Sequence, residues 1–276
     1  MPELVWALGC IRYAPALGCL LDYLQSEDEP VRSAAALALL RMGEPRAVDY
    51  CLGQAQSNTW PIMPLGLAGG RDSLALLTEL AKKSDGGECL TALGLLGDPS
   101  SLPLLMSRLE EAPAATALHC LTGAGLYETV FVPEEVDEDE LFESEKEQLK
   151  QGKPLTRGDG RPFGTTVTRI SQKPEDWDRW WRENGNRFSP SMRYRNGGPL
   201  SPSRLVDMLS TPSTPHELRR YCSEELAVRY GQDFALEMDT PVVRQVGLLS
   251  EMISWSKSSA TQFREGAWYF AGYQRD

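Results

Sequence analysis

The chain has 276 residues, a formal net charge of −11 and 41% hydrophobic residues, a composition typical of a globular protein with an ample core. No apolar run reaches the roughly 18 residues of a membrane-spanning helix, which excludes an integral membrane protein and a membrane partner. The six cysteines include no C-x-x-C pair, and the first residues lack the basic region of an export signal. We therefore expect buried, reduced thiols and a cytoplasmic protein.

A repeat occurs in the first half of the chain. Its turn positions are Arg12, Gly43, Gly69, Gly97 and, in a weaker copy, Gly125. The first four are 31, 26 and 28 residues apart. A glycine at a helix end favours the left-handed backbone, and a proline soon after it is typical of the start of the next helix. The pattern therefore predicts pairs of helices joined by short turns.

The two helices of each pair differ in composition. After each turn, apolar residues follow at i, i+3 and i+7, as at Leu17, Leu20 and Leu24, which indicates an amphipathic second helix. The first helices are rich in alanine and leucine, which allows neighbouring helices to approach closely. Because one pair cannot bury its apolar stripe alone, the pairs must stack. This predicts an α-solenoid.

Residues 30–39 followed by 43–48 resemble the two-helix consensus of HEAT-repeat proteins. The resemblance extends over about residues 1–126, which we take as the first domain. It implies an α-solenoid architecture and leaves the activity open, because solenoids serve many functions.

The pattern changes after residue 126. Residues 127–132 and 163–170 alternate and are rich in β-branched side chains, which predicts two strands that pair as an antiparallel ribbon. Nine acidic residues and one lysine lie between positions 134 and 147, a local charge of −8, and residues 138–150 could form a solvated helix. We take residues 127–172 as a ribbon with an acidic, flexible insertion.

The third region, residues 173–276, is predicted to be helical. Residues 173–185 frame a short helix in which Trp177, Trp180 and Trp181 share one face, as core residues or as anchors for a partner. Three more helices are predicted over 201–210, 214–230 and 240–257, and they include a further HEAT-like pair.

Residues 160–255 also resemble an uncharacterised bacterial family of HEAT-related proteins that is often encoded among type VI secretion genes. The matching positions are Trp177, Trp181, Asn186, Phe188, Arg193-Tyr194-Arg195, Gly198-Pro199-Leu200, Glu224-Glu225-Leu226 and Gln245. The resemblance implies an adaptor, an effector chaperone or an immunity protein, and it transfers no catalytic residue.

No pattern in the sequence indicates catalysis. His119 lies in an apolar helix, and His216 precedes Glu217 where a helix is expected to begin. H-E-x-x-H and a phosphate-binding loop are absent, and Cys120 beside His119 points away from it on a helix. We therefore expect no enzyme, no catalytic residue, no metal, no cofactor and no small-molecule substrate.

A basic segment follows the acidic one. Twelve lysines and arginines accompany five acidic residues between positions 150 and 204, a local charge of +7. Arginines interleave with aromatics at 180–182 and 193–195, which would suit stacking on nucleic acid, yet the pI near 4.9 disfavours a nucleic-acid partner. The acidic and basic segments could face each other, meet different partners or form two solvated surfaces.

We predict an all-α solenoid of HEAT-like helical hairpins with a small two-stranded β-ribbon insertion. Its expected function is to bind another protein, as an adaptor or chaperone for a secreted effector or as an immunity protein against a toxin. An enzyme with a site in the solenoid groove is a further alternative. The predicted partner-binding residues are Asp22, Asp49, Glu79, Arg108, Glu138, Asp139, Glu140, Arg193 and Arg195.

Overall fold

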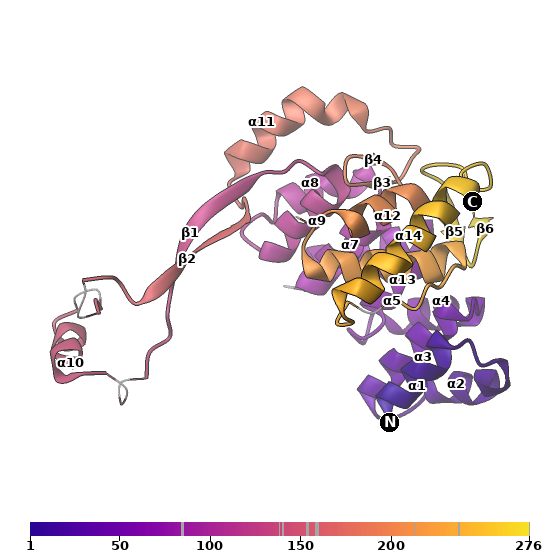
Figure 1. The fold of residues 1–276 in the computed structure, drawn as a ribbon, viewed down its shortest axis with the longest axis horizontal. Coiled ribbons are helices and arrows are strands. Elements are labelled where there is room, and N and C mark those ends of the chain that lie inside the picture. The colour runs from indigo at the N-terminus through magenta and orange to yellow at the C-terminus, as the bar shows by residue number, and fades with distance from the viewer. Residues whose placement is uncertain are drawn as a thin grey trace. The chain divides into compact units, whose positions relative to one another are not determined.

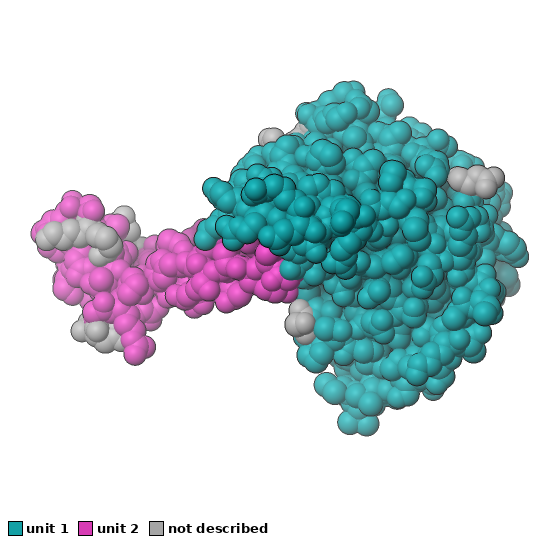
Figure 2. Space-filling view, turned by 90° about the horizontal axis from the view of Figure 1, so that it is seen from above, with its two compact units in different colours: residues 1–124, 172–276 teal, residues 125–171 magenta. Residues whose placement is uncertain are grey.

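The computed structural model describes residues 1–83, 86–137, 139, 141–152, 155–157, 160–212, 214–236 and 238–275. These residues form fourteen α-helices and three two-stranded antiparallel pairs (Figure 1). In this part of the chain, no helix is long and apolar enough to cross a membrane. The chain divides into two compact units, coloured separately in Figure 2. Unit 1 comprises residues 1–124 and 172–276, and unit 2 comprises residues 125–171.

Helices of two kinds alternate along the first part of unit 1. The first helices of the pairs are α1 (Pro2–Cys10), α3 (Glu29–Arg41), α5 (Ile62–Ala68), α7 (Gly87–Leu96) and α9 (Ala112–Thr122). The second helices are α2 (Leu17–Tyr23), α4 (Pro45–Gln54), α6 (Arg71–Lys83) and α8 (Leu102–Met106). Each first helix packs on the next, from α1 on α3 to α7 on α9. The predicted helical hairpins are therefore present, in the predicted order.

Three of the turns between paired helices have the predicted left-handed backbone. Arg12, Gly43 and Gly97 have φ angles of 49°, 77° and 71°. After two of these turns, the side chains of Glu44 and Asp98 accept hydrogen bonds from the first backbone amides of the next helical segment, which begins with proline. An acidic N-cap followed by proline stabilises a helix start, because it satisfies one free amide and removes another.

The left-handed turn predicted at Gly69 is wrong, and the weaker repeat copy predicted at Gly125 lacks a second helix, because strand β1 (Tyr127–Pro133) follows a turn in which Gly125 has φ 64°. Gly69 is extended, with φ −66° and ψ 159°. A Cβ on Gly69 would lie 2.4 Å from the Cβ of Ser73, so close packing rather than backbone freedom requires glycine there. Helix α9 ends at Thr122, and its C-cap Gly123, with φ 61°, lies two residues before Gly125.

Small residues let the first helices approach closely, as expected from their composition. A Cβ added to Gly66 on α5 would lie 2.9 Å from Ala92 on α7, and one added to Gly94 on α7 would lie 2.7 Å from Ala117 on α9. These distances are shorter than any normal carbon contact. The spacing between neighbouring first helices therefore depends on glycine at these crossing points.

The rest of unit 1 contains helices and two short hairpins. The elements are α11 (Pro174–Asn184), β3 (Tyr194–Arg195), β4 (Gly198–Pro199), α12 (Pro202–Ser210), α13 (His216–Tyr230), α14 (Val242–Ser258), β5 (Trp268–Phe270) and β6 (Tyr273–Arg275). All four predicted helices are confirmed, and His216 begins α13 as expected. The hairpin of β5 and β6 was not predicted, because strands of three residues are too short to show an alternating pattern.

The tryptophan-rich helix α11 contributes to the core through one of its three tryptophans. Trp177 is buried, whereas Trp180 and Trp181 are half-buried. Both half-buried rings pack against Phe188, whose ring centroid lies 4.8 Å from that of Tyr194 on β3. The interpretation as core therefore holds for Trp177, and the other two rings pack on the aromatic residues that follow the helix.

Unit 2 contains the predicted ribbon. Strand β1 (Tyr127–Pro133) pairs with β2 (Gly164–Ile170) in antiparallel register, with Tyr127 opposite Ile170, which confirms the predicted pairing. Helix α10 (Glu143–Lys150) lies between the strands in sequence and begins five residues later than predicted.

Candidate interaction surfaces

The first helices α3, α5, α7 and α9 are buried on nearly all sides, whereas α1 buries only Val5 and Gly9. In α7 the buried residues are Cys89, Leu90 and the whole stretch 92–96. In α6, by contrast, the buried residues are Ser73, Leu77 and Ala81, a single stripe at a spacing of four. A helix that is apolar all round must be covered on more than one side. The second helices cover one side of the first helices, so another part of the chain must cover the other side.

The C-terminal part of unit 1 provides this cover. Helix α13 packs on α3 and α5, and β3 packs on α9; Figure 1 shows α13 beside α5. One apolar cluster joins Leu67 and Leu95 of the repeats to Leu205 and Leu226 of the C-terminal helices. The first helices therefore form the middle layer of unit 1. The outer sides of the second helices stay exposed.

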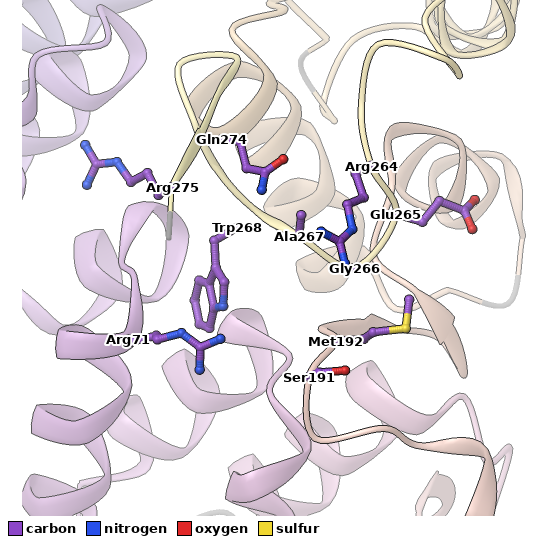
Figure 3. Close-up of a pocket in the computed structure, with 10 residues that line it drawn as sticks. All are labelled: Arg71, Ser191, Met192, Arg264, Glu265, Gly266, Ala267, Trp268, Gln274 and Arg275. Atoms are coloured by element: carbon purple, nitrogen blue, oxygen red, sulfur yellow. The ribbon is translucent and has the colours of Figure 1, made fainter.

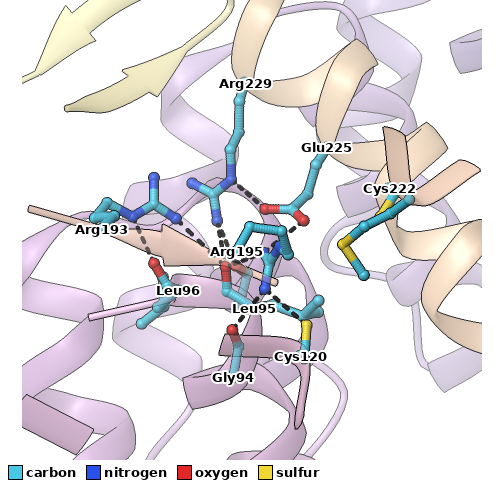
Figure 4. A network of polar contacts seen from close by, with 11 residues as sticks. Gly94, Leu95, Leu96, Cys120, Arg193, Arg195, Cys222, Glu225 and Arg229 are labelled. Carbon is cyan, nitrogen blue, oxygen red and sulfur yellow. Dashed lines mark hydrogen bonds and ion pairs between the residues drawn. The ribbon is translucent and has the colours of Figure 1, made fainter. Parts of the chain in front are cut away.

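A buried charge network of Arg193, Arg195, Glu225 and Arg229 lies where α13 meets the repeats (Figure 4). Glu225 on α13 accepts hydrogen bonds from Arg195 at 2.6 Å and from Arg229 at 2.7 Å, and all three side chains are fully buried. Burial opposes the charge on Glu225, but Arg195 and Arg229 outweigh it and lower the pKa of its carboxyl group. The carboxylate is therefore ionised at neutral pH and balances part of the charge of the arginines.

The arginines of this network also cap the C-terminal end of α7. The last carbonyl groups of a helix have no partner within the helix and form the negative end of its dipole. Arg195 donates to the carbonyls of Gly94 and Leu95 at 2.7 Å each, and Arg193 donates to the carbonyl of Leu96. These contacts fix the end of α7 to the C-terminal part of unit 1.

The predicted role of Arg193 and Arg195 in partner binding is wrong. Their side chains are only 1% and 0% exposed, so a partner cannot reach them. The guanidinium of Arg193 donates to α7, and that of Arg195 donates to Glu225. Arginines in a basic segment are usually exposed, and the groups that hold these two in the core are distant in the sequence. The sequence alone therefore gave no sign of these contacts. A signal for burial existed elsewhere: Glu225 and Arg229 continue the helical stripe of apolar residues on α13.

The cysteines differ in environment. All six are free; Cys19 is exposed and Cys10 half-buried, so the prediction that all are buried is wrong for these two. Burial raises the pKa of the buried Cys120 and Cys222 thiols, although Arg195 opposes this shift. A thiol with a raised pKa stays protonated at neutral pH and is a poor nucleophile. Cys120 and Cys222 thus serve as packed core side chains.

His119 is buried, as expected, and burial lowers the pKa of its imidazole. Within the described part of the chain, no three potential metal ligands come together.

The outer side of the second helices carries three predicted contact residues. Asp22 on α2, Asp49 on α4 and Glu79 on α6 are exposed. Arg108 is not free for a partner as predicted, because it is partly buried and donates to the carbonyl of Ala81 at 2.7 Å. Arg108 thereby links α6 to the end of the following helix pair.

Among the residues that the structure describes, this second-helix side carries no large exposed apolar side chain. Among the described residues, the large exposed hydrophobic side chains lie on α1 and the turn after it, in unit 2, on α14 and at Tyr273. Protein interfaces depend mostly on a few desolvated anchors, commonly aromatic residues or arginine. The second-helix side can therefore supply charge to a partner, but it lacks an apolar anchor.

Unit 2 combines apolar and acidic side chains on its surface. Phe131 and Val132 on β1 are each 45% exposed, and Phe142, directly before α10, is 76% exposed. Asp139, one of the predicted contact residues, is also exposed. The predicted contact residues Glu138 and Glu140 lie outside the described residues. Unit 2 thus offers both charge and apolar anchors, whereas the second-helix side offers charge alone.

The ribbon of unit 2 also has unpaired edges. In the residues that the structure describes, its sheet has two strands, so the outer edge of each has no neighbouring strand in that sheet. On one face Glu128 pairs with Arg169 at 2.9 Å, and on the other Phe131 lies opposite Thr166. An exposed strand edge can accept an extended segment of another chain by backbone hydrogen bonds.

Comparison with known proteins supports the repeat assignment for part of the chain. A family model of HEAT repeats matches residues 3–63, a range that begins within α1 and ends at the start of α5. The comparison found no matching curated protein and no matching solved structure. Similarity to HEAT repeats is compatible with a role in protein interaction, since such repeats generally act as scaffolds for other proteins.

Proposed function

We propose that this protein is a non-enzymatic scaffold or adaptor that binds another protein through unit 2, with unit 1 as the packed support. One observation carries this proposal. Phe131, Val132 and Phe142 are exposed in the same small unit as the acidic segment, whereas the described residues of the second-helix side include no such anchor. Exposed aromatic side chains of this kind favour a protein partner.

The charge of unit 2 defines the expected partner surface. The segment 134–147 carries a charge of −8, and Glu135, Asp137 and Asp139 are exposed. Complementary charge mainly accelerates association and selects the partner, whereas buried apolar contacts provide affinity. We therefore expect a basic partner surface with apolar residues, and an association rate that falls as the salt concentration rises.

The ribbon suggests how the partner binds. An extended segment of the partner would pair with an outer edge of β1 or β2 and place alternate side chains on each face. On the face that carries Phe131, apolar side chains of the partner would be covered. We expect such a segment to alternate apolar and basic residues.

Two specific roles follow from the resemblance of residues 160–255 to proteins encoded among type VI secretion genes. As an adaptor or chaperone, the protein would hold a secreted effector. As an immunity protein, it would cover the active site of a toxin, and its acidic segment would suit a cationic nuclease. Co-expression with the partner separates the roles: rescue of growth by this protein alone favours immunity, and improved solubility or delivery of the partner favours an adaptor.

The decisive experiment removes the ribbon. Because Tyr127 and Ile170 lie opposite each other, a short Gly-Ser linker can replace residues 128–169 without separating the ends of unit 1. We expect the excised protein to fold and to lose the partner that the full-length protein retains on affinity purification from its native host. The matched variant D22A/D49A/E79A changes the second-helix side and should keep the partner. The reverse result would locate the interface on the second helices and refute the assignment to unit 2.

An enzymatic role in the solenoid groove is the alternative from another class. It would be supported if the purified protein, free of its partner, turned over a substrate, and if substitution of titratable residues on the second helices abolished that activity.

A further inference from the structure

A small polar cavity lies in unit 1 beside the hairpin of β5 and β6 (Figure 3). Its volume is about 200 Å³, and its walls include Arg71, Arg264, Trp268 and Gln274. Arg71 is the first residue of α6, so the cavity brings the repeats and the C-terminal hairpin together. Pockets for drug-sized molecules start at roughly 300 Å³, so this cavity suits a small group rather than a whole cofactor.

The side chains around the cavity are predominantly cationic. Arg71, Arg264 and Arg275 line it together with one acidic residue, Glu265. In Figure 3 the carboxylate of Glu265 points away from the space between Trp268 and Met192. In the part of the chain that the structure describes, neither Arg71 nor Arg264 has an ion-pair partner, although the chain as a whole carries a charge of −11. The cavity is therefore a cationic site in an acidic protein.

Arg275 contributes less than the other two arginines. Its guanidinium carbon lies 4.4 Å from the ring centroid of Phe270, and Figure 3 shows the side chain directed away from Trp268. The cationic groups available in the cavity are thus Arg71 and Arg264.

The residues around Trp268 add to the positive charge near the cavity. The ring of Trp268 is buried, and the guanidinium of Arg193 lies 4.2 Å from its centroid. Arg193 is buried, and its Nη1 atom has no hydrogen-bond partner among the described residues. Part of its positive charge is therefore not balanced by hydrogen-bond acceptors. Charge in a poorly solvated interior acts over a longer range than charge in water. The buried guanidinium of Arg193 therefore adds positive potential next to the ring.

We propose that this cavity binds an oxyanion, that is, a carboxylate or phosphate group, between Arg71 and Arg264 and against Trp268. Guanidinium groups bind such oxygens through charge-assisted hydrogen bonds, often in pairs. The group could belong to a free anion such as phosphate, or to an acidic peptide segment.

The test uses the full-length protein and the indole N–H signals in a nitrogen–proton NMR spectrum. The variant W268F assigns the signal of Trp268. Inorganic phosphate and an acidic peptide of alternating glutamate and serine are titrated separately, with sodium chloride at matched ionic strength as reference. We expect the Trp268 signal to shift saturably, and the double variant R71Q/R264Q to bind at least tenfold more weakly. The control R179Q, an exposed arginine on α11, should bind as the wild type does.

Each outcome decides between alternatives. Tighter binding of the peptide than of phosphate would identify a protein segment as the ligand, and the reverse order would identify a free anion. Absence of a saturable shift with both probes, or equal shifts in the wild type and in R71Q/R264Q, would overturn the proposal. Both substituted arginines are exposed, so the spectra of the variants should otherwise remain unchanged. The site lies in unit 1, so excision of the ribbon tests the proposed function separately.

Discussion

Two charge-rich regions of this chain occupy opposite environments. The network of Arg193, Arg195, Glu225 and Arg229 is buried in unit 1, whereas the acidic residues described in segment 134–147 of unit 2 are mostly exposed. In the sequence, the first region consists of two pairs of nearby charged residues and the second is a run of acidic residues, so neither pattern reveals which one is buried. A charged segment can therefore connect parts of the core or remain exposed to solvent, depending on the groups that the fold brings to it.

The energetics of the two regions differ accordingly. A buried charge loses its hydration and needs several fixed partners, which the α7 carbonyls and Glu225 supply to the arginines. Exposed ion pairs such as that of Glu134 with Arg157 contribute little, because water already solvates both groups. The buried network should therefore be sensitive to single changes, and the acidic segment should tolerate them.

The largest effect is expected from Glu225→Gln. The change leaves three buried arginines without a counter-charge, so the free energy of unfolding should fall by about 3–5 kcal/mol. Urea unfolding followed by circular dichroism measures it. The control Glu251→Gln, exposed on α14, should change stability by less than about 0.5 kcal/mol. Equal effects of the two variants would show that burial of the network adds nothing to the stability of unit 1.

A second prediction concerns the close approach of α7, whose carbonyl groups accept hydrogen bonds from the network, to the neighbouring first helix α9. Gly94→Ala would place a Cβ 2.7 Å from Ala117, so we expect a loss of about 1–3 kcal/mol from overpacking. Gly53→Ala on α4 has open space around the new methyl group and should stabilise the protein by up to about 1 kcal/mol. Thermal unfolding of the two variants separates the effect of packing from that of helix propensity. If both alanine variants were more stable than the wild type, the close crossing of α7 and α9 would be contradicted.

The third prediction is a pH dependence. The pKa of Glu225 is lower in the folded protein than in the unfolded chain, so its contribution is complete above the unfolded value of about 4.3 and is lost as the pH falls through the folded value. The difference in stability between wild type and Glu225→Gln should therefore shrink in acid, by about 1.4 kcal/mol for each pH unit between the two values. Urea unfolding at pH 7, 5, 4 and 3 measures this; a difference that stays constant would contradict an ionised Glu225.

The smallest effect on stability is expected in unit 2. The double variant E135Q/D137N removes two exposed charges and should change the free energy of unfolding by less than about 0.5 kcal/mol. It should nevertheless slow association with a basic partner, most clearly at low salt. Stopped-flow or surface-plasmon measurements at two salt concentrations check this. A large loss of stability would show that the acidic segment belongs to the core after all.

Local signals in the sequence predicted much of the fold. Glycine or arginine turns followed by proline predicted the helix pairs, and alternating β-branched residues predicted the ribbon, because turn and strand preferences act over a few neighbouring residues. The exposure of Asp22, Asp49 and Glu79 followed from the apolar stripes of the same helices. These features depend on contacts close in the sequence.

By itself, the sequence determined the helix pairs, their order and the ribbon, since periodicity and turn chemistry act within each segment. Only the tertiary structure decided that the C-terminal part covers the first helices, that Arg193 and Arg195 are buried, and that Arg71 meets Trp268 in one cavity. Each of these depends on groups about 100 to 200 residues apart. The physical reason is that the environment of a charge is set by what surrounds it in space.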